Sequence, residues 1–374
     1  MMPNMRSSIH HATTAGLVAL GIALIEAPAQ VETDARRVVR LDGRGATLVI
    51  DLGGGSIVDF HFGRDGLNPL RWLAPADADK ALRPMAHFLC LDRWGPPSAA
   101  ESRNGMPFHG EASRVEWKQI GASERRSGRI SAVMEATLPI AGLEVRRTVE
   151  LSDASSFFTV SETVTNRNKL GRVYNMVQHA TIGPPFLDEN TMVDSNAQRG
   201  FMQSSPLPNP EQIEIRWPQA VKDGKAVDLR RLTTDPDPNV TSFVIDDDVG
   251  WVTATNPSKE LLIGYIFKTA DYPWLNIWRH VQNGKPLARG LEFGTSGLHQ
   301  PFPILIRKPS IFGRSTFTYL DAGDSAIRTY SAFLLEVPPD FGGVERVMHR
   351  TGSIVVQERG GKGRELRLPA DRVF

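Results

Sequence analysis

Four segments of the sequence concentrate His, Arg and carboxylate side chains beside Gly, Pro or aromatic residues. They are LDRWGPPSAAESRNGMPFHGE (residues 91–111), NMVQHATIGPPFL (175–187), DYPWLNIWRH (271–280) and GLEFGTSGLHQPFP (290–303). Imidazole titrates near neutral pH, and burial can raise the pKa of a carboxyl group towards the same range. A His and a Glu that meet in a fold can therefore exchange protons with a bound substrate, so these segments carry groups suited to general acid–base chemistry.

The order of three short motifs is more specific than any one of them. MPFHGE contains His109, VQHATIG contains His179 as it enters a strand, and GLEFG contains Glu292 in an apolar strand. In this order the motifs resemble the galactose mutarotase-like superfamily, which includes the aldose 1-epimerases. The closing segment LDAGDSAIRTYSAFL is similar to the end of that family, and the resemblance covers residues 41–337.

The resemblance implies an all-β fold, a large antiparallel β-sandwich of the supersandwich kind, and a site that interconverts the anomers of a free sugar. In that reaction a base takes the proton of the C1 hydroxyl while an acid protonates the ring oxygen, and each transfer contributes about 10²- to 10⁴-fold. By resemblance, Glu292 is the base, His179 is the acid, and His109 orients or stabilises the substrate. No cofactor and no metal are expected.

Further side chains are expected to bind the sugar. Arg93 matches the tendency of the family to place an Arg on sugar hydroxyls. Trp278 and Arg279, with Trp274 beside them, can supply a stacking face and hydrogen-bond donors. The family also carries an Asp that binds sugar hydroxyls. Its counterpart here is left open among three residues, of which the last is included in the predicted site: Asp194, Asp246 and Asp271.

The surroundings of His179 depart from the family pattern. In aldose 1-epimerases an aromatic residue and an Asn follow the second His, whereas Ala180, Thr181 and Ile182 follow it here. An alternative function therefore stays open, a non-catalytic carbohydrate-recognition or polysaccharide-processing accessory protein with the same fold. A lyase or hydrolase acting on a polysaccharide is a weaker alternative.

Two other chemistries lack their sequence signatures. A metal site would need a compact ligand set such as HExxH, and none appears. A serine hydrolase would need a G-x-S-x-G turn between a strand and a helix, and GTSG at residues 294–297 is only a fragment of it.

Strand-forming sequence must position the motifs. Residues 128–167 give three runs, RISAVMEATL, GLEVRRTVEL and SFFTVSETVTN, each with β-branched residues and an alternating pattern. Residues 45–63 predict two strands around a Gly triplet, and further runs such as LLIGYIF and WLNIWRH predict more. Long amphipathic helices are hard to find, and 26 prolines disfavour them. The pattern predicts an all-β protein.

The first 29 residues are predicted to be a signal peptide. Arg6 supplies a positive charge, residues 15–25 form an apolar stretch too short to span a bilayer, and Ala27-Pro28-Ala29 fits the cleavage pattern. The mature protein is therefore expected to be periplasmic or secreted. Residues 30–341 are predicted to form the β-sandwich domain, and residues 342–374 a C-terminal tail with a peripheral hairpin.

Charge and cysteine content narrow the possible partners. The formal net charge is +1 with no block of like charge, so nothing points to nucleic acid or an acidic membrane surface. Cys90 is the single cysteine, which excludes an intrachain disulfide and a thiolate zinc site. The expected partner is a small-molecule sugar or oligosaccharide, with no nucleic acid and no membrane after signal removal. The identity of the sugar and the oligomeric state are left open.

Overall fold

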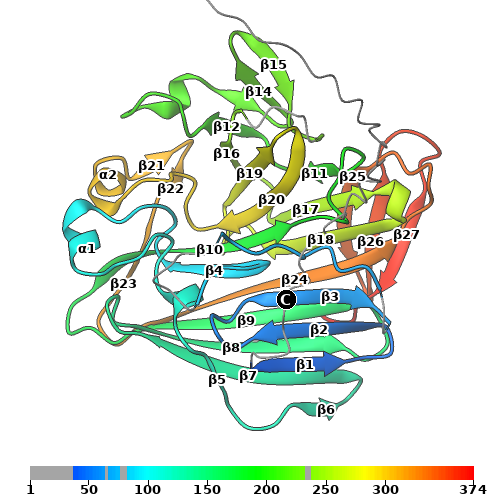
Figure 1. Ribbon diagram of the computed structural model, residues 1–374, viewed down its shortest axis with the longest axis horizontal. Helices are drawn as coiled ribbons and strands as arrows, with labels where there is room; N and C mark the ends of the chain where they lie inside the picture. The colour runs from blue at the N-terminus through cyan, green and yellow to red at the C-terminus, as the bar shows by residue number, and fades with distance from the viewer. Residues whose placement is uncertain (1–36, 64–65, 76–81, 232–236) are drawn as a thin grey trace, which may run out of the picture. The chain divides into compact units, whose positions relative to one another are not determined.

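Antiparallel sheets make up most of the chain in the computed structural model, which describes residues 37–63, 66–75, 82–231 and 237–374 (Figure 1). These residues belong to one compact unit, Thr33–Phe374. The predicted signal peptide, residues 1–29, lies outside the described residues. None of the helices in the described ranges combines the length and the apolar character needed to cross a bilayer.

The first large sheet carries the segments with the candidate chemistry. Its strands, in spatial order, are β1 (Val38–Asp42), β2 (Ala46–Asp51), β3 (Ile57–Phe62), β4 (His87–Asp92), β10 (Arg172–Ile182), β20 (Lys285–Gly294), β19 (Trp274–Gln282), β16 (Val240–Val244), β12 (Arg199–Met202) and β13 (Ile215–Arg216), with β23 (Thr318–Leu320) paired to β10. Strands from distant parts of the sequence therefore lie side by side.

The second large sheet packs against the first. Its strands are β11 (Met192–Ser195), β17 (Val249–Asn256), β18 (Leu261–Lys268), β24 (Ser325–Glu336), β9 (Phe157–Asn166), β8 (Leu143–Ser152), β7 (Arg129–Leu138) and β5 (Lys118–Gln119), with β6 (Glu124–Arg126) paired to β7. Ring contacts join the sheets, with Phe60 and Phe158 at 4.8 Å and Phe267 and Phe293 at 4.4 Å between centroids. The predicted all-β sandwich is confirmed.

The strands of the two sheets differ in how their residues are buried. Strands β7 and β8 alternate between buried and more exposed residues, as a sheet with one solvated face requires. In contrast, all of β4 and most of β10 and β20 are buried on both faces, Cys90 included. The outer face of the first sheet is therefore covered where these strands run.

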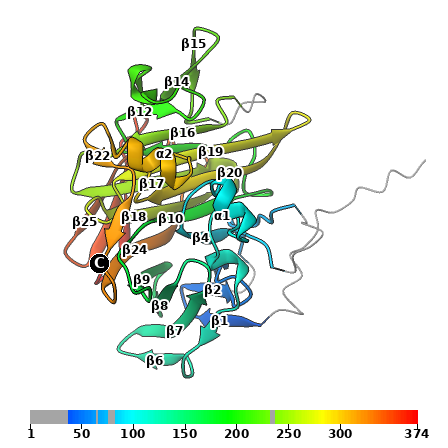
Figure 2. The same ribbon diagram turned by 90° about the vertical axis from the view of Figure 1, so that its left-hand side faces the viewer.

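Other short elements lie outside the two large sheets. They are α1 (Ala99–Arg103), α2 (Phe302–Arg307), one-turn 3₁₀ helices at Ala112–Arg114, Pro210–Gln212 and Pro257–Lys259, and the hairpins β14 (Gln219–Lys222)–β15 (Lys225–Asp228) and β21 (Ser310–Ile311)–β22 (Arg314–Ser315). Figure 2 shows the β14–β15 hairpin beyond β12 and β16, at the same end as in Figure 1. The segment between β12 and β16, residues 203–239, thus contains a small hairpin.

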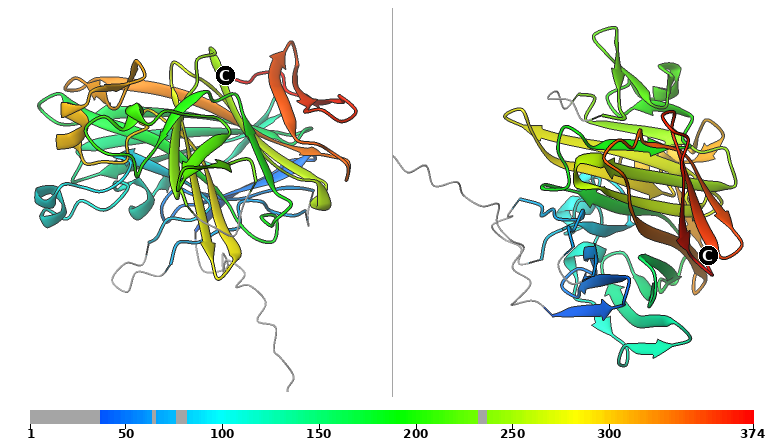
Figure 3. Two further views of the ribbon diagram at one scale, coloured as in Figure 1. Left: turned by 90° about the horizontal axis from the view of Figure 1, so that it is seen from above. Right: turned by 90° about the vertical axis from the view of Figure 1, so that its right-hand side faces the viewer.

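The C-terminal residues form a separate small sheet of β25 (Val344–Arg350), β26 (Ser353–Glu358) and β27 (Glu365–Pro369), drawn in orange-red to red in Figure 3. Its apolar side chains, Val347 and Ile354 among them, share one buried cluster with Trp251 and Phe333 of the second sheet. Residues 353–369 thus contain a hairpin, and a third strand precedes it. The boundary at residues 341/342 stays a prediction.

Candidate functional site

The register of five neighbouring strands gathers one set of side chains on the outer face of the first sheet. Residues opposite each other in an antiparallel pair project to the same face. Phe88 of β4 lies opposite His179 of β10, and Val240 of β16 lies opposite Trp278 of β19. Strands β10 and β20 pair Gln178 with Phe293 and Thr181 with Gly290, a register that brings His179 opposite Glu292.

The residues next to these in sequence point the other way, into the sandwich. Gln178 donates from Nε2 to Oε2 of Glu162 at 2.6 Å, and its Oε1 lies 3.2 Å from Nε2 of His87. Arg147 donates from Nε to the other oxygen of Glu162 at 2.7 Å. These buried polar groups hold the two sheets together. The strand period of two therefore separates this core network from the outer-face residues.

A cavity of about 320 Å³ lies over the outer-face residues. Its volume is at the lower end of the range of small-molecule sites. Aromatic rings form much of its wall: Trp72, Phe88, Trp94, Phe108 and Trp278. The polar groups that line it include three imidazoles, one carboxyl group, one guanidinium and one amide: His109, His179, His299, Glu292, Arg114 and Asn239. The cavity therefore combines apolar faces with a few convergent polar groups.

His179 and Glu292 lie next to each other in the lining of this cavity. Nε2 of His179 lies 3.2 Å from Oε1 of Glu292. The indole N–H of Trp94 donates to Oε2 of Glu292 at 2.7 Å, and Nδ1 of His179 lies 2.9 Å from Oγ1 of Thr181. The imidazole also stacks on Phe88 at 4.2 Å between ring centroids. Both groups are thus fixed in position on two sides.

Burial keeps both members of the pair uncharged at neutral pH. It raises the pKa of Glu292 from 4.5 to about 8, although the hydrogen bond from Trp94 lowers it. It also lowers the pKa of His179 from 6.5 to about 3, and His299 and His87 lower it further. Burial thus favours the protonated carboxyl group of Glu292 and the neutral imidazole of His179.

His109 reaches the cavity from the loop between β4 and the 3₁₀ helix at Ala112–Arg114. The N–H of Gly95 donates to its Nδ1 at 3.1 Å, and its own N–H donates to the Gly95 carbonyl at 3.0 Å. Burial lowers the pKa of His109 well below 6.5, with His179 and His299 adding to the effect. A neutral imidazole that accepts at Nδ1 carries its hydrogen on Nε2. His109 is therefore held as a donor at Nε2.

The same loop adopts backbone conformations that few residues tolerate. His109 has a φ of 65°, in the left-handed region that is uncommon for residues other than glycine. Gly95 has a φ of 106°, and a Cβ atom there would lie 3.0 Å from the His299 ring. Such conformations persist where the surrounding structure enforces them. Here they bring Trp94 and His109 towards the same carboxyl–imidazole pair.

The predicted site residues fall into two groups. His109, His179, Trp278 and Glu292 line the cavity together, while Arg93, Arg279 and Asp271 do not line it. The structure tests none of their predicted roles, so these roles stay predictions.

Each residue outside the cavity has partners of its own. Arg93 is buried, pairs with Asp92 and Glu101, and lies over the ring of Phe302. Arg279 donates to the carbonyl groups of Asp237 and Pro238, and the Asp271 carbonyl accepts from Arg328.

The other residues considered from the sequence also lie apart from the cavity. Trp274 is buried and donates from Nε1 to the Ser315 carbonyl at 2.8 Å. Asp194 is buried and pairs with Arg230 at 2.5 Å, and Asp246 pairs with Arg314 at 3.4 Å. These contacts hold neighbouring segments together.

Several cavity residues were not singled out from the sequence. Trp94 and His299 lie within segments 91–111 and 290–303, so the clustering of polar groups with Gly and Pro already marked their neighbourhood. Trp72 and Arg114 lie outside the four segments, and no motif marks them. In the described ranges, no group of three or more His, Cys, Asp or Glu residues is arranged to hold a metal ion.

Comparison with known proteins gives a family and a fold. Residues 89–301 match the model of a family described as a domain of unknown function, DUF4432. No curated protein matches the sequence.

Three similar structures define the fold. A candidate aldose 1-epimerase from Escherichia coli K12 has a TM-score of 0.56 at 15% identity, covering 80% of this chain and 99% of its own. A galactose mutarotase related enzyme from Lactobacillus acidophilus has a TM-score of 0.57 at 11% identity, with 81% and 98% covered. A galactose mutarotase-like protein from Clostridium acetobutylicum has a TM-score of 0.55 at 13% identity, with 82% and 98% covered. The fold is galactose mutarotase-like, which confirms the resemblance drawn from the three motifs.

Proposed function

This chain belongs to the DUF4432 family and has a galactose mutarotase-like fold. We propose that it is an aldose 1-epimerase-like isomerase that interconverts the anomers of a free sugar. The pairing of His179 with Glu292 at 3.2 Å in a buried, aromatic cavity carries the proposal. General acid–base chemistry needs a donor and an acceptor within reach of one substrate, and this pair supplies both.

Ring opening moves one proton to a base and one proton from an acid. A base takes the proton of the C1 hydroxyl, the C1–O1 bond becomes a carbonyl, the bond from C1 to the ring oxygen breaks, and an acid protonates that oxygen. Rotation about the C1–C2 bond and the reverse steps give the other anomer. No atom is gained or lost, so the reaction needs neither an oxidant nor a co-substrate.

The single proton of the pair fits these roles. Transfer of the proton from Oε1 of Glu292 to Nε2 of His179 leaves a carboxylate beside an imidazolium. Glu292 is then the base at the C1 hydroxyl and His179 is the acid at the ring oxygen. At the end of each turnover the pair again holds one proton. His109, as a donor at Nε2, would hydrogen-bond the substrate and stabilise the charge that develops on an oxygen during the transfers.

The aromatic wall suits the apolar faces of a sugar ring. Trp278 and Trp72 meet edge to face at 5.6 Å between centroids, and Phe108 is 47% exposed at the rim of the cavity. Large rings offer flat apolar surfaces, while the polar atoms of the hydroxyls need the imidazole and carboxyl groups. This division matches a ligand that is apolar on its faces and polar around its edge.

Polarimetry of freshly dissolved α-D-galactose and α-D-glucose tests the proposal. The expected result is a rate of mutarotation that rises linearly with protein concentration above the buffer rate. Glu292→Gln should abolish the acceleration, whereas Glu124→Gln, at an exposed position of β6, should keep it. Rates equal to the buffer rate, together with sugar binding, would instead indicate the carbohydrate-recognition alternative.

Export is proposed separately, from the predicted signal peptide of residues 1–29. Expression of the full chain in a Gram-negative host, followed by fractionation and mass spectrometry, is the test. Recovery from the periplasm or medium with an N-terminus near Gln30 is expected. Recovery of the intact chain from the cytoplasm would contradict export.

A further inference from the structure

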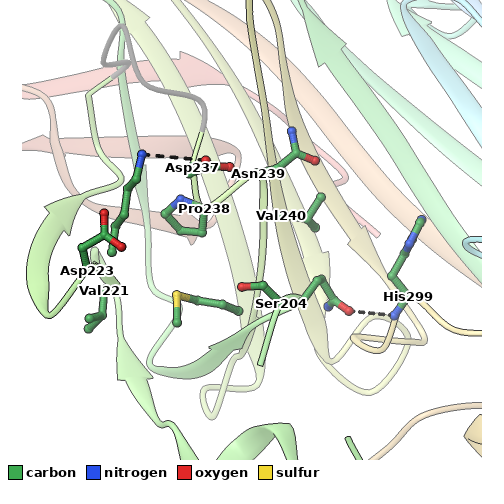
Figure 4. A pocket seen from close by; sticks show the side chains of 11 residues that line it. Ser204, Val221, Asp223, Asp237, Pro238, Asn239, Val240 and His299 are labelled. Atoms are coloured by element: carbon green, nitrogen blue, oxygen red, sulfur yellow. Dashed lines mark hydrogen bonds and ion pairs between the residues drawn. The ribbon is translucent and has the colours of Figure 1, made fainter. Parts of the chain in front are cut away.

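A second hollow adjoins the candidate site. This outer cavity is lined by the end of β12, the β14–β15 hairpin, the segment before β16, and His299 (Figure 4). Its volume is about 660 Å³, about twice the 320 Å³ of the site cavity. Asn239, Val240 and His299 line both cavities. The two cavities therefore adjoin along these three residues.

Hydrogen bonds fix the junction between the two cavities. Gln203 donates from Nε2 to the Gly297 carbonyl and to Oγ of Ser242, each at 2.7 Å. Its Oε1 accepts the backbone N–H of His299 at 3.0 Å. One side chain therefore holds both the loop that carries His299 and strand β16. A preformed junction of this kind spares a ligand the cost of ordering it.

Two segments face each other across the outer cavity. Figure 4 shows Val221 and Asp223 of the hairpin on one side, and Asn239, Val240 and His299 on the other. The ammonium group of Lys222 lies 3.7 Å from Oδ2 of Asp237, which ties the hairpin to the segment before β16. The hairpin thus closes a wall that the sheet alone would lack.

The outer cavity differs in chemistry from the site cavity. Its lining includes two amides, one hydroxyl and two carboxylates, groups that donate to or accept from sugar hydroxyls, and it contains none of the aromatic Trp and Phe rings of the site cavity. Two carboxylates, Asp223 and Asp237, stand against one ammonium group, Lys222. Burial lowers the pKa of His299 to about 4, so this imidazole adds no charge at neutral pH. The lining of the outer cavity therefore has no surplus of cationic groups to hold an acidic sugar unit.

We propose that the substrate is a neutral oligosaccharide, with its reducing-end unit in the site cavity and the following units in the outer cavity. The inference rests on the proposed anomer exchange, which fixes the reducing end at His179 and Glu292. If one sugar unit occupies the site cavity, the volume ratio gives the outer cavity room for about two more.

The test compares trisaccharides with their monosaccharides. Cellotriose, laminaritriose, maltotriose and β-1,4-galactotriose are the neutral probes, and trigalacturonate is the acidic one. Turnover is followed by polarimetry on the parent protein, and binding by calorimetry on Glu292→Gln. We expect at least one neutral trisaccharide to bind about tenfold more tightly than its monosaccharide, a difference of about 1.4 kcal/mol in binding free energy. In turnover the gain should appear mainly as a lower KM. Trigalacturonate should show no gain.

Variants that fill the outer cavity test whether the trisaccharide advantage arises there. Ser204→Leu and Val221→Arg add bulk without an aromatic ring and should reduce the trisaccharide-to-monosaccharide ratio of kcat/KM towards one. Ile327→Arg, at a position that is 65% exposed on β24, is the matched control and should keep the ratio.

The outcomes separate this inference from the proposed function. Accelerated mutarotation of monosaccharides with no trisaccharide advantage would overturn the oligosaccharide inference and leave the anomer exchange standing. Tighter trisaccharide binding with no turnover of any sugar would overturn the anomer exchange, and with it the placing of the reducing end, and would leave only oligosaccharide binding. Preferential binding of trigalacturonate, or an advantage that survives both filling variants, would also overturn the inference.

Discussion

His179 and Glu292 lie opposite each other on neighbouring strands, with 3.2 Å between Nε2 and Oε1. Burial disfavours the charged form of each, so the pair holds one proton between two groups whose ordinary pKa values would leave it ionised. The testable properties of the site follow from this one proton.

Removing either member of the pair should abolish catalysis while binding persists. Glu292→Gln keeps an oxygen for Trp94, and His179→Asn keeps a hydrogen-bonding side chain, but neither can exchange a proton near neutral pH. We expect mutarotation rates to fall by about 10²- to 10⁴-fold, the usual contribution of one general acid or base. Polarimetry measures the rate, and calorimetry should give sugar affinities within about threefold of the parent. A fully active Glu292→Gln protein would contradict the mechanism.

The pH dependence of kcat/KM should report the loss of the shared proton. The pair is active with one proton, whichever of the two atoms carries it, and such coupled groups titrate as a unit. Activity should therefore stay level through neutral pH and decline above about 8, where Glu292 ionises and the pair becomes proton-free. Rates corrected for the buffer reaction give the profile. A rise through pH 8 would show that the proton-free pair is the active form.

Glu292 should also make stability depend on pH. Its pKa is higher in the folded protein, about 8, than its ordinary value of 4.5, so the folded state binds this proton more tightly than the unfolded state. The contribution of Glu292 to the free energy of unfolding should then decrease as pH rises from about 4.5 to about 8, at about 1.4 kcal/mol for each unit. Glu292→Gln removes this contribution. The melting temperature of the variant, relative to that of the parent, should increase by several degrees between pH 6 and pH 9. An equal difference at both pH values would contradict the buried, protonated carboxyl group.

Trp94 should act as a positioning residue for Glu292. Trp94→Phe keeps an apolar ring but removes the indole N–H that lies 2.7 Å from Oε2. Because that bond favours the carboxylate, its loss should raise the pKa of Glu292 and move the alkaline decline of kcat/KM to higher pH, by up to about one unit. We also expect the rate on the plateau to fall about tenfold, since the carboxyl group loses one of its two anchors. A lower rate with an unmoved decline would indicate a packing role alone.

The sequence predicts the strands of this protein better than the walls of its cavity. The runs within residues 128–167 form β7, β8 and β9, because alternation and β-branched residues are local signals. His179 and Glu292 were found by motif order, and the register that joins them is a property of the sheet.

Trp72 and Arg114 could not be found in the same way. They reach the cavity from segments before β4 and after the His109 loop, so their place depends on how loops fold over the sheet. Arg93 shows that a residue close to the site in sequence can still lie outside the cavity. It stands beside Trp94 in sequence, but its guanidinium pairs with Asp92 and Glu101.

Side chains along β4, β10 and β20 alternate between the sandwich interior and the cavity, and this limits which sequence changes the strands can accept during evolution. His87 and Phe88, Gln178 and His179, and Glu292 and Phe293 each place one side chain in the sandwich and its neighbour at the cavity. Insertion or deletion of a single residue within these strands would exchange the two sets. A lineage can therefore acquire new ligands by altering the loops and the β14–β15 hairpin, whereas the paired strands tolerate substitution but not a change of length.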